Sequence, residues 1–285
     1  MTMLHDERPL QRAGHIGDVD NRYCGAAVFG ELARTLVDPS ELVARACGVS
    51  GMSAEDRDVV RAIALALTSP DARVWPLKLA RTLASFGNAH AGLHGAQLLN
   101  AGVTMGPGAH ASCAASLRWL HERVGDDPPD DALAAALDEH DRLNRRFCGF
   151  GVPLRPFDER IVGLHACLRG HAATRRRYWR FAQRVGDAVK ARDRIEPNIV
   201  LPLSALMLDL GFSPRRCAVF AGAMISHCFT AHAVEAAEQD GPWLRALPAA
   251  AIDDRSPPLR TSTGTATSTK PAGPGSAAPR RSLPW

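Results

Sequence analysis

The chain has 285 residues, 46% of them hydrophobic and 22% charged, with 34 lysines and arginines against 30 acidic residues and a formal net charge of +4. These proportions are ordinary for a globular protein and exclude a wholly disordered chain. No strictly apolar run reaches the roughly 18–20 residues of a membrane span, which argues against an integral membrane protein. The small positive charge is only weak evidence for a polyanionic partner, so we expect neither a nucleic acid nor a membrane as a partner.

The cysteines and the first residues bear on the cellular compartment. The first twelve residues carry charges and no apolar stretch, so no secretory signal is expected. The seven cysteines are odd in number and scattered, without a CxxC pair, which argues against a disulfide framework or a zinc ribbon. We therefore expect a cytoplasmic protein with unpaired thiols at Cys24, Cys47, Cys113, Cys148, Cys167, Cys217 and Cys228.

The organisation along the chain predicts a folded helical region with a flexible N-terminal segment and a disordered C-terminal tail. Residues 1–20 are expected to be flexible, and residues 259–285 to be disordered, because a Ser-, Thr-, Gly- and Pro-rich tail buries too little apolar surface to offset its ordering entropy. Between them, apolar residues recur at helical spacing, and no alternating strand or tight Asn-Gly hairpin is found. The predicted fold class is all-α, with about ten to twelve helices. The clearest helices are expected over residues 53–67, 70–86, 110–124, 130–147, 174–195 and 213–238.

Several of these helices carry start signals or a distinctive face. Ser53 followed by Asp56 resembles a capping box, and Pro214 directly after Ser213 suits the first helical position. The helix over 213–238 is apolar nearly all round until Glu235, so we expect it to be central and buried. The arginine run on the helix over 174–195 predicts a solvated face formed by Arg175, Arg176, Arg177, Arg180 and Arg184.

General catalytic motifs are absent, since the chain contains no P-loop, GxGxxG, HExxH or GxSxG pattern. His90 and His94 have the i,i+4 spacing of two metal ligands on one helix face. No HExxH-type glutamate accompanies them, however, and Gly92 and Gly95 are expected to interrupt the helix, so no metal site is predicted. His227 and His232, on the long apolar helix, are interpreted as satisfied core histidines.

Three segments form an ordered set of motifs. They are 91–97 (AGLHGAQ), 148–160 (CGFGVPLRPFDER) and 196–211 (EPNIVLPLSALMLDLG), the last followed by a helix that contains 231–235 (AHAVE). In order and spacing, the set resembles the citrate synthase family, including its short citryl-CoA lyase-like members. That family has a GPLHG-type turn, a GFGH…DPR loop and a PN-(I/V)-D segment before a central helix containing ART…AH. The resemblance covers roughly residues 55–245.

The resemblance implies a fold, a chemistry and partners. It implies a large helical domain over 21–102 and 206–258, a smaller one over 103–205, a cleft at their junction and a homodimer. The implied substrates are an acyl-coenzyme A thioester, bound as substrate rather than as a tightly held cofactor, and a keto acid. A carboxylate base removes a proton beside the thioester carbonyl while a histidine stabilises the enolate, and arginines hold the acid's carboxylates.

Matching positions imply site residues one by one. His94 falls on the enolate-stabilising histidine, and Arg160 falls on the DPR arginine that binds a carboxylate. Gly149, Phe150 and Gly151 match the GFG of the coenzyme A loop. Asn198 matches the PN motif and is a candidate substrate contact, with an N-cap role as the plainer alternative.

Other family positions are substituted. Val152 stands in place of the loop histidine, Val200 in place of the general-base aspartate, and Ile225 with Ser226 in place of the Arg-Thr pair. Valine neither accepts a proton nor donates a hydrogen bond, so ordinary citrate synthesis by the usual residues is not expected. Three interpretations stay open: an enzyme with altered chemistry, an inactive member with a binding or regulatory role, and a chance match in another helical domain. In the first, the substitute base would be Asp71, Asp209 or His227, and Asp71 is also the least secure match to an upstream substrate histidine.

Overall fold

The computed structural model describes residues 13–15, 19–35, 38–68, 71, 74–100, 106–144, 147–152 and 156–239. All of them belong to one unit that spans Met1–Leu244. The predicted disordered tail, 259–285, lies outside the described residues, as do 1–12 and 16–18 of the predicted flexible N-terminus.

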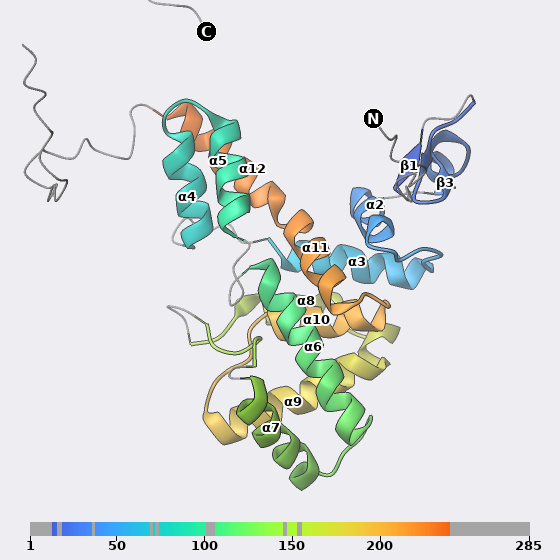
Figure 1. Ribbon diagram of the computed structural model, residues 1–285, viewed down its shortest axis with the longest axis vertical. Coiled ribbons are helices and arrows are strands. Elements are labelled where there is room, and N and C mark those ends of the chain that lie inside the picture. Colours follow the sequence, from blue (N-terminus) through green and yellow to red (C-terminus); the bar gives the residue numbers. More distant parts are fainter. Residues whose placement is uncertain are drawn as a thin grey trace, which may run out of the picture. The chain divides into compact units, whose positions relative to one another are not determined.

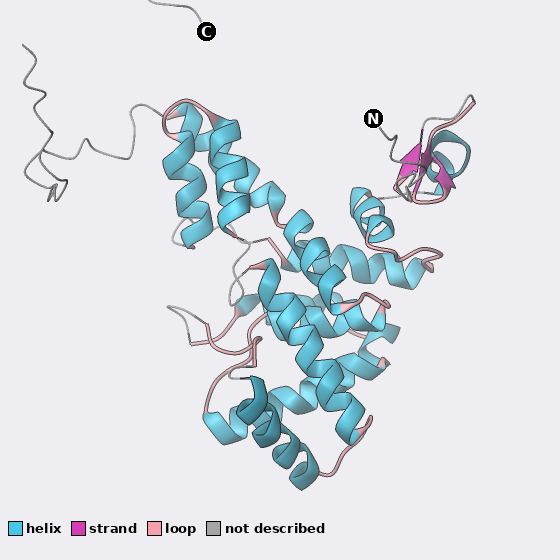
Figure 2. Cartoon of the chain, viewed as in Figure 1, coloured by secondary structure: helices cyan, strands magenta, loops and turns pink. Residues whose placement is uncertain are grey.

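The all-α prediction is confirmed, because helices form nearly all of the regular structure in the described chain (Figures 1 and 2). Their order is α1 (Ala33–Thr35), α2 (Pro39–Ala46), α3 (Ala54–Ala66), α4 (Trp75–Ala84), α5 (Ala89–Leu99), α6 (Pro107–Val124), α7 (Asp130–Asn144), α8 (Glu159–Cys167), α9 (Arg177–Asp193), α10 (Val200–Asp209), α11 (Pro214–Met224) and α12 (Ser226–Glu238). A π-helix, η1 (Val28–Leu32), precedes α1, and a 3₁₀ helix, η2 (Ala172–Arg175), precedes α9.

Short strands that the sequence pattern did not indicate lie near the N-terminus. Three two-residue strands, β1 (Gly14–His15), β2 (Arg22–Tyr23) and β3 (Ala26–Ala27), form a small antiparallel sheet in that order. A two-residue strand is too short to show alternation in a sequence. The tight turn between β2 and β3 instead uses left-handed backbone at Cys24 (φ 46°) and Gly25 (φ 86°).

Local chemistry explains where several helices start. Ser53 and Asp56 form the predicted reciprocal capping box of α3, and the Ser213 side chain caps α11, with Pro214 in its first turn. The predicted start at Pro70 lies outside the described residues; α4 begins at Trp75, with a proline in its own first turn.

Two predicted helices are broken in the structure. The segment over 174–195 divides at Arg176, which is extended (φ −71°, ψ 157°) between η2 and α9. The segment over 213–238 divides at Ile225 into α11 and α12, and the Ser226 hydroxyl donates a hydrogen bond to the Ala223 carbonyl at 2.6 Å. A serine that bonds back to the preceding turn is known to bend helices.

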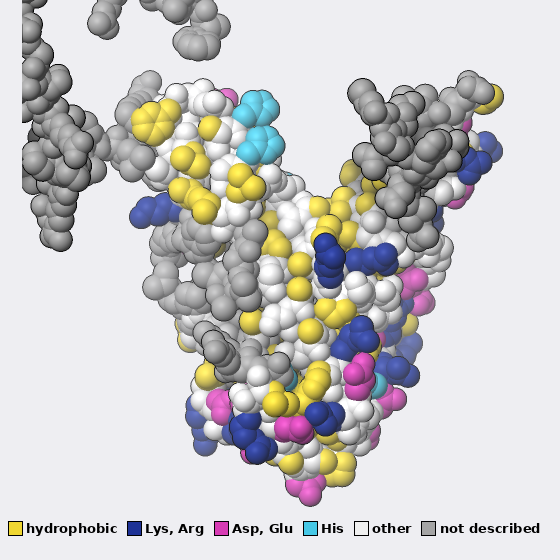
Figure 3. Space-filling model, in the orientation of Figure 1, with side chains coloured by type: hydrophobic (Ala, Val, Ile, Leu, Met, Phe, Trp, Pro, Cys, Tyr) yellow, Lys and Arg dark blue, Asp and Glu magenta, His cyan; other side chains and the backbone are white. Residues whose placement is uncertain are grey.

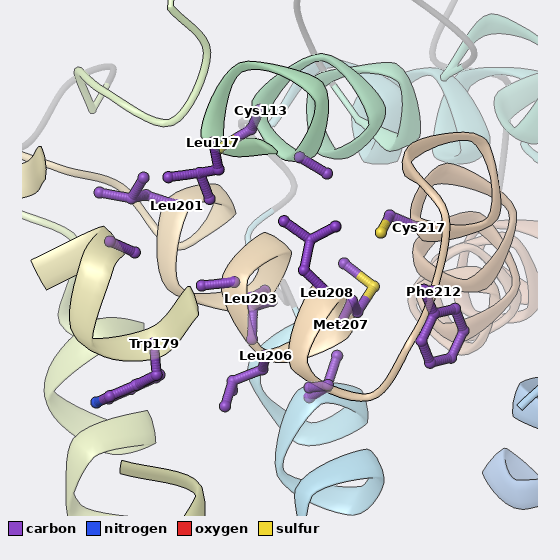
Figure 4. Close-up of a cluster of buried hydrophobic side chains, with 14 of the residues drawn as sticks. Cys113, Leu117, Trp179, Leu201, Leu203, Leu206, Met207, Leu208, Phe212 and Cys217 are labelled. Atoms are coloured by element: carbon purple, nitrogen blue, oxygen red, sulfur yellow. The ribbon is translucent and has the colours of Figure 1, made fainter. Parts of the chain in front are cut away.

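The hydrophobic core surrounds α10, whose residues Leu201–Leu208 are all buried. Figure 4 shows Leu203, Leu206 and Met207 among side chains from the neighbouring helices α6, α9 and α11. The main cluster extends from α2 to α11, apart from α4 and α5, and so draws on both segments of the predicted division into domains. That division, with boundaries at 102, 205 and 258, stays a prediction.

Two smaller clusters hold α4, α5 and α12 together, and they consist mainly of alanine with Leu77 and Phe229. Arg81 of α4 is buried against α12, where it pairs with Glu235 at 2.8 Å and contacts His232 Nδ1 at 3.3 Å. His232 is buried, as predicted for a core histidine, whereas His227 is exposed and contacts Thr68 and the Met224 carbonyl.

Membrane-like composition occurs once in the described chain. By length and composition, the stretch Pro214–Glu238 could cross a membrane, and 39% of its most apolar window is buried. A core helix of a soluble protein passes the same test, and α11 and α12 pack against α6, α4 and α5. The composition of this one stretch is therefore weak support for a span.

Gly92 lies where α5 closely approaches α4. A Cβ atom there would lie 2.5 Å from the Ala80 carbonyl oxygen and 2.7 Å from the Ala84 Cβ. Replacing Gly92 by alanine is therefore expected to lower the free energy of unfolding by about 1–3 kcal/mol, as overpacking does. Urea denaturation measures this. Gly163→Ala is the control, because a Cβ at this position of α8 meets nothing within 4 Å and the better helix former should not destabilise. Equal stability of the Gly92 and Gly163 variants would contradict the packing described here.

Candidate functional site

Two of the three motif segments meet in the structure. Phe150 and Pro197 form an antiparallel bridge, the Gly151 N–H donates to the Glu196 carbonyl at 2.8 Å, and the Asn198 N–H donates to the Gly149 carbonyl at 2.8 Å. The loop over 147–151 and the segment over 196–199 are thereby held side by side by backbone hydrogen bonds. We call these two segments together the paired loops.

Asn198 fastens the paired loops with its side chain. Its Nδ2 donates to the Gly151 carbonyl at 2.9 Å, and its Oδ1 accepts from the Val200 N–H at 3.0 Å. The second bond satisfies a backbone donor in the first turn of α10, as an N-cap side chain does. Asn198 is thus a structural residue of the site, and the predicted substrate contact stays a prediction.

Glycine is needed in the 147–151 loop. Gly149 has φ 108° and Gly151 has φ 79°, in the region that side chains disfavour. A Cβ on Gly149 would lie 3.1 Å from the Leu201 Cβ and 3.2 Å from the Cys113 Sγ. The loop therefore lies directly on α6 and α10, and the side chain of Phe150, within the loop, is buried.

A buried carboxylate joins the paired loops to α8. Asp158 is 2% exposed, accepts two hydrogen bonds of 2.8 Å from the Arg160 guanidinium and accepts the Ile199 N–H at 2.9 Å. Burial raises the pKa of Asp158, but its bonds to Arg160 and Ile199 outweigh this and hold the pKa below the ordinary value. Arg160 is thus oriented bidentately beside the paired loops, with a quarter of its side chain exposed.

His110 completes this group of residues, and the sequence analysis missed it. It lies in the first turn of α6, is 4% exposed, and its Nδ1 is 3.5 Å from the Ser204 Oγ of α10. Burial lowers its pKa to about 4, and the charge of Arg160 acts in the same direction. The signal in the sequence is Gly106-Pro107: Gly106 is left-handed (φ 65°), and the proline starts α6.

The group formed by His110, Arg160 and the paired loops offers a definite chemistry. Because its pKa is low, the His110 imidazole is neutral at pH 7, so it can donate a hydrogen bond to a developing oxyanion without carrying charge. The Arg160 guanidinium supplies a cation for a carboxylate, and the glycine-rich loop lets a ligand approach the backbone. These groups suit binding and polarisation of a carbonyl compound that bears a carboxylate.

His94, the predicted enolate-stabilising histidine, has different surroundings. It lies on the exposed face of α5, and its described ring contact is with His90, at 6.1 Å between centroids. The helices that α5 packs against are α4 and α12, which carry no residue of the paired loops. The predicted catalytic role of His94 stays a prediction.

The substituted positions lie beside the paired loops. Val152 directly follows Gly151, and Val200 is the first residue of α10; both are partly buried. Among the three candidate substitute bases, Asp209 has a structural role: its carboxylate accepts hydrogen bonds from the Tyr178 and Trp179 N–H groups at 2.9 and 2.8 Å. Burial raises its pKa despite these bonds. Asp71 precedes α4, where its carbonyl accepts the Val74 N–H.

Among the described residues, no group of three or more His, Cys, Asp or Glu side chains is arranged to hold a metal ion. Among the described cysteines, Cys24, Cys47, Cys113, Cys148, Cys167 and Cys217 are free thiols. Burial raises the pKa of Cys113, which lies beneath Gly149, so its thiol is protonated at neutral pH.

Comparison with known proteins gives structural matches only. No protein-family model matches the sequence, and no curated protein matches it by sequence. Citryl-CoA lyase from Hydrogenobacter thermophilus is similar with a TM-score of 0.68 at 17% identity, covering 96% of each chain. ATP citrate lyase from Methanothrix soehngenii, in complex with citrate and coenzyme A, gives 0.69 at 14% identity over 87% of this chain and 42% of that one. Citrate synthase from Thermotoga maritima gives 0.50 at 22% identity over 71% and 57%.

These matches confirm the predicted resemblance at the level of the fold: the chain has a citrate synthase-like, all-α fold. The similarity to citryl-CoA lyase extends over 96% of both chains, whereas the chain spans only part of the other two proteins. Sequence identities of this size establish no activity, substrate or partner by themselves.

Proposed function

Starting from the citrate synthase-like fold, we propose that the chain binds a coenzyme A thioester and cleaves or forms the carbon–carbon bond between its acyl group and a keto acid. The observation that carries the proposal is that Asp158 holds Arg160 beside the paired loops, in a chain whose fold matches citryl-CoA lyase over 96% of both lengths. Neighbours of the same fold are described with citrate and coenzyme A, or with carboxymethyl coenzyme A and oxaloacetate.

In the cleavage direction, the bond between the thioester's α-carbon and the hydroxyl-bearing carbon breaks. The hydroxyl loses its proton and becomes the keto group, while the electron pair of the broken bond forms an enolate on the thioester, which takes up a proton to give the acyl-CoA. The proposed role of His110 is to donate a hydrogen bond to the enolate oxygen, and that of Arg160 is to hold a carboxylate of the acid.

The substitutions at Val152 and Val200 favour a second candidate, a catalytically inactive protein that still binds the thioester. Neither side chain can transfer a proton, and general acid–base help is worth about 10²–10⁴-fold in rate. In this alternative the paired loops and Arg160 keep their binding role, and the protein acts as a binding or regulatory partner.

The test measures turnover and binding together. The purified full chain is incubated with citryl-CoA, and released oxaloacetate is followed through NADH oxidation by malate dehydrogenase. The reverse reaction is followed by liquid chromatography as citryl-CoA formed from acetyl-CoA and oxaloacetate, and free thiol reports any further hydrolysis of that thioester to citrate. Coenzyme A is titrated by calorimetry in the same buffer. Turnover in either direction supports the enzyme, and binding without turnover supports the inactive alternative. A chain that neither turns over nor binds coenzyme A contradicts both.

The valines offer a gain-of-function prediction. Val200→Asp combined with Val152→His is expected to raise citrate-forming turnover above that of the parent chain, because it supplies a carboxylate and an imidazole beside the paired loops. The thiol-release assay measures this, and Val200→Asn with Val152→Asn is the control, since it adds polarity without a proton acceptor. A folded double variant that is no faster than its control would contradict the proposed geometry.

A homodimer and a cytoplasmic location belong to the same proposal. Leu98, Val219 and Val234 are 78%, 58% and 44% exposed on α5, α11 and α12, and a second copy would cover such apolar surface. Light scattering of the full chain tests the dimer, and a monomer at micromolar concentration would contradict it. The free thiols of the described chain suit a reducing compartment, which fractionation of the source cells tests directly.

A further inference from the structure

We propose that His90 and His94 form a binding site for a divalent first-row transition-metal ion, of the class of Ni²⁺, Cu²⁺ and Zn²⁺, on the exposed face of α5. The two imidazole rings are nearly parallel, with an interplanar angle of 10° and centroids 6.1 Å apart. Both residues are exposed. Figure 3 shows histidine side chains gathered on the surface of this part of the molecule, beside exposed apolar ones.

The spacing on α5 suits chelation of one ion. Residues four apart on a helix have Cβ atoms about 5–6 Å apart on the same face. Imidazole nitrogens that bind zinc do so at about 2.0–2.1 Å, so small rotations of two stacked rings bring both nitrogens to one ion. The continuity of α5 matters here, because the expectation that Gly92 and Gly95 interrupt the helix was wrong: α5 runs unbroken from Ala89 to Leu99.

The same glycines fix which way the histidines face. Gly92 and Gly95 lie against α4, where added Cβ atoms would meet the Ala80 carbonyl oxygen at 2.5 Å and the Leu83 Cδ1 at 2.4 Å. The helix start is fixed as well, since the Asn88 side chain accepts the Ala91 N–H at 3.0 Å. With its glycine face held inward, α5 presents His90 and His94 outward on a rigid support, and pre-organised ligands lose little freedom on binding.

The ligand set selects the class of metal. Two neutral imidazoles suit nickel, copper and zinc, whereas magnesium and calcium require oxygen ligands. Since no third His, Cys, Asp or Glu joins them in the described chain, water completes the coordination and the site stays open. This inference is independent of the proposed function, because it uses neither the paired loops nor His110.

The experiment titrates NiCl₂ into the full chain, purified without a histidine tag, by calorimetry. A Cys167→Ser background removes the exposed thiol as a competing ligand. One ion per chain is expected, with tighter binding of Cu²⁺ than of Ni²⁺ or Zn²⁺ and no response to Mg²⁺. His90→Gln and His94→Gln should each weaken binding at least about tenfold, because even loss of an outer-shell partner costs that much.

The matched control keeps the number of histidines and changes only their spacing. His94→Gln with Ala91→His places both imidazoles on adjacent residues, which do not face each other on a helix. This variant should bind as weakly as His94→Gln alone. Parent-like nickel affinity in His94→Gln or in the spacing variant would overturn the site. Circular dichroism of each variant verifies that α5 is still folded, and catalytic assays are not involved, so failure here leaves the proposed function untouched.

Discussion

Replacing His110 by alanine is expected to lower kcat for citryl-CoA cleavage about 10²–10³-fold, the usual cost of removing one oxyanion donor. The reason is that His110 is a neutral imidazole buried in the first turn of α6, with a pKa that burial and the charge of Arg160 lower to about 4. KM should change much less, because the proposed hydrogen bond strengthens only as negative charge develops on the thioester oxygen. Coupled release of oxaloacetate measures both constants.

Three further variants make the His110 result specific. His110→Gln keeps a hydrogen-bond donor and should recover part of the lost rate. His165→Ala removes an exposed histidine of α8 whose ring lies 5.1 Å from that of Trp179, and it should leave kcat unchanged. His94→Ala tests the histidine that the sequence resemblance selected as the enolate-stabilising residue. A large loss of rate in His94→Ala with none in His110→Ala would place the reacting carbonyl elsewhere.

The Asp158→Ala variant is expected to lose about 3–5 kcal/mol of unfolding free energy, the range found when one partner of a buried ion pair is removed. The substitution strands the Arg160 guanidinium and leaves the buried Ile199 N–H without its 2.9 Å acceptor. Urea denaturation measures the loss. Asp187→Ala is the control, because Asp187 is an exposed aspartate on α9 and should change stability little.

The same carboxylate predicts a pH dependence. The pKa of Asp158 is lower in the folded state than the value of about 3.9 expected when the chain is unfolded. Its stabilising contribution is therefore fully present above that unfolded value and is lost as the pH falls through the folded-state pKa. The stability difference between the parent and Asp158→Ala should shrink in strong acid. A difference that stays constant from neutral to acidic pH would show that the carboxylate charge has no part in it.

Local chemistry made much of the fold predictable. The capping box at Ser53 and the Ser213-Pro214 start were read from the chain because each involves only neighbouring residues. The break at Ile225 was not predicted, because the apolar periodicity continues through it. The hydrogen bond from Ser226 to the Ala223 carbonyl is only one of several local hydrogen bonds that a serine side chain can form.

The site was predicted in part for a similar reason. Gly149, Gly151, Asn198 and Arg160 stood within recognisable motifs, and the structure brings them together through Asp158 and the paired loops. His110 stood in no such motif. What places it is the packing of α6 against α10, a contact between residues about 94 positions apart in the sequence, which local patterns do not encode.

The separation of the hydrophobic clusters has a consequence for how the molecule opens. All residues from Leu201 to Leu208 of α10 are buried and six of them belong to the main cluster, so the amide protons of this helix should exchange with solvent only when the whole core unfolds. The helices α4, α5 and α12 instead share small, alanine-rich clusters of their own. Their amides should exchange earlier, through a partial opening that leaves α10 protected, and unfolding of this chain is expected to proceed in at least two steps.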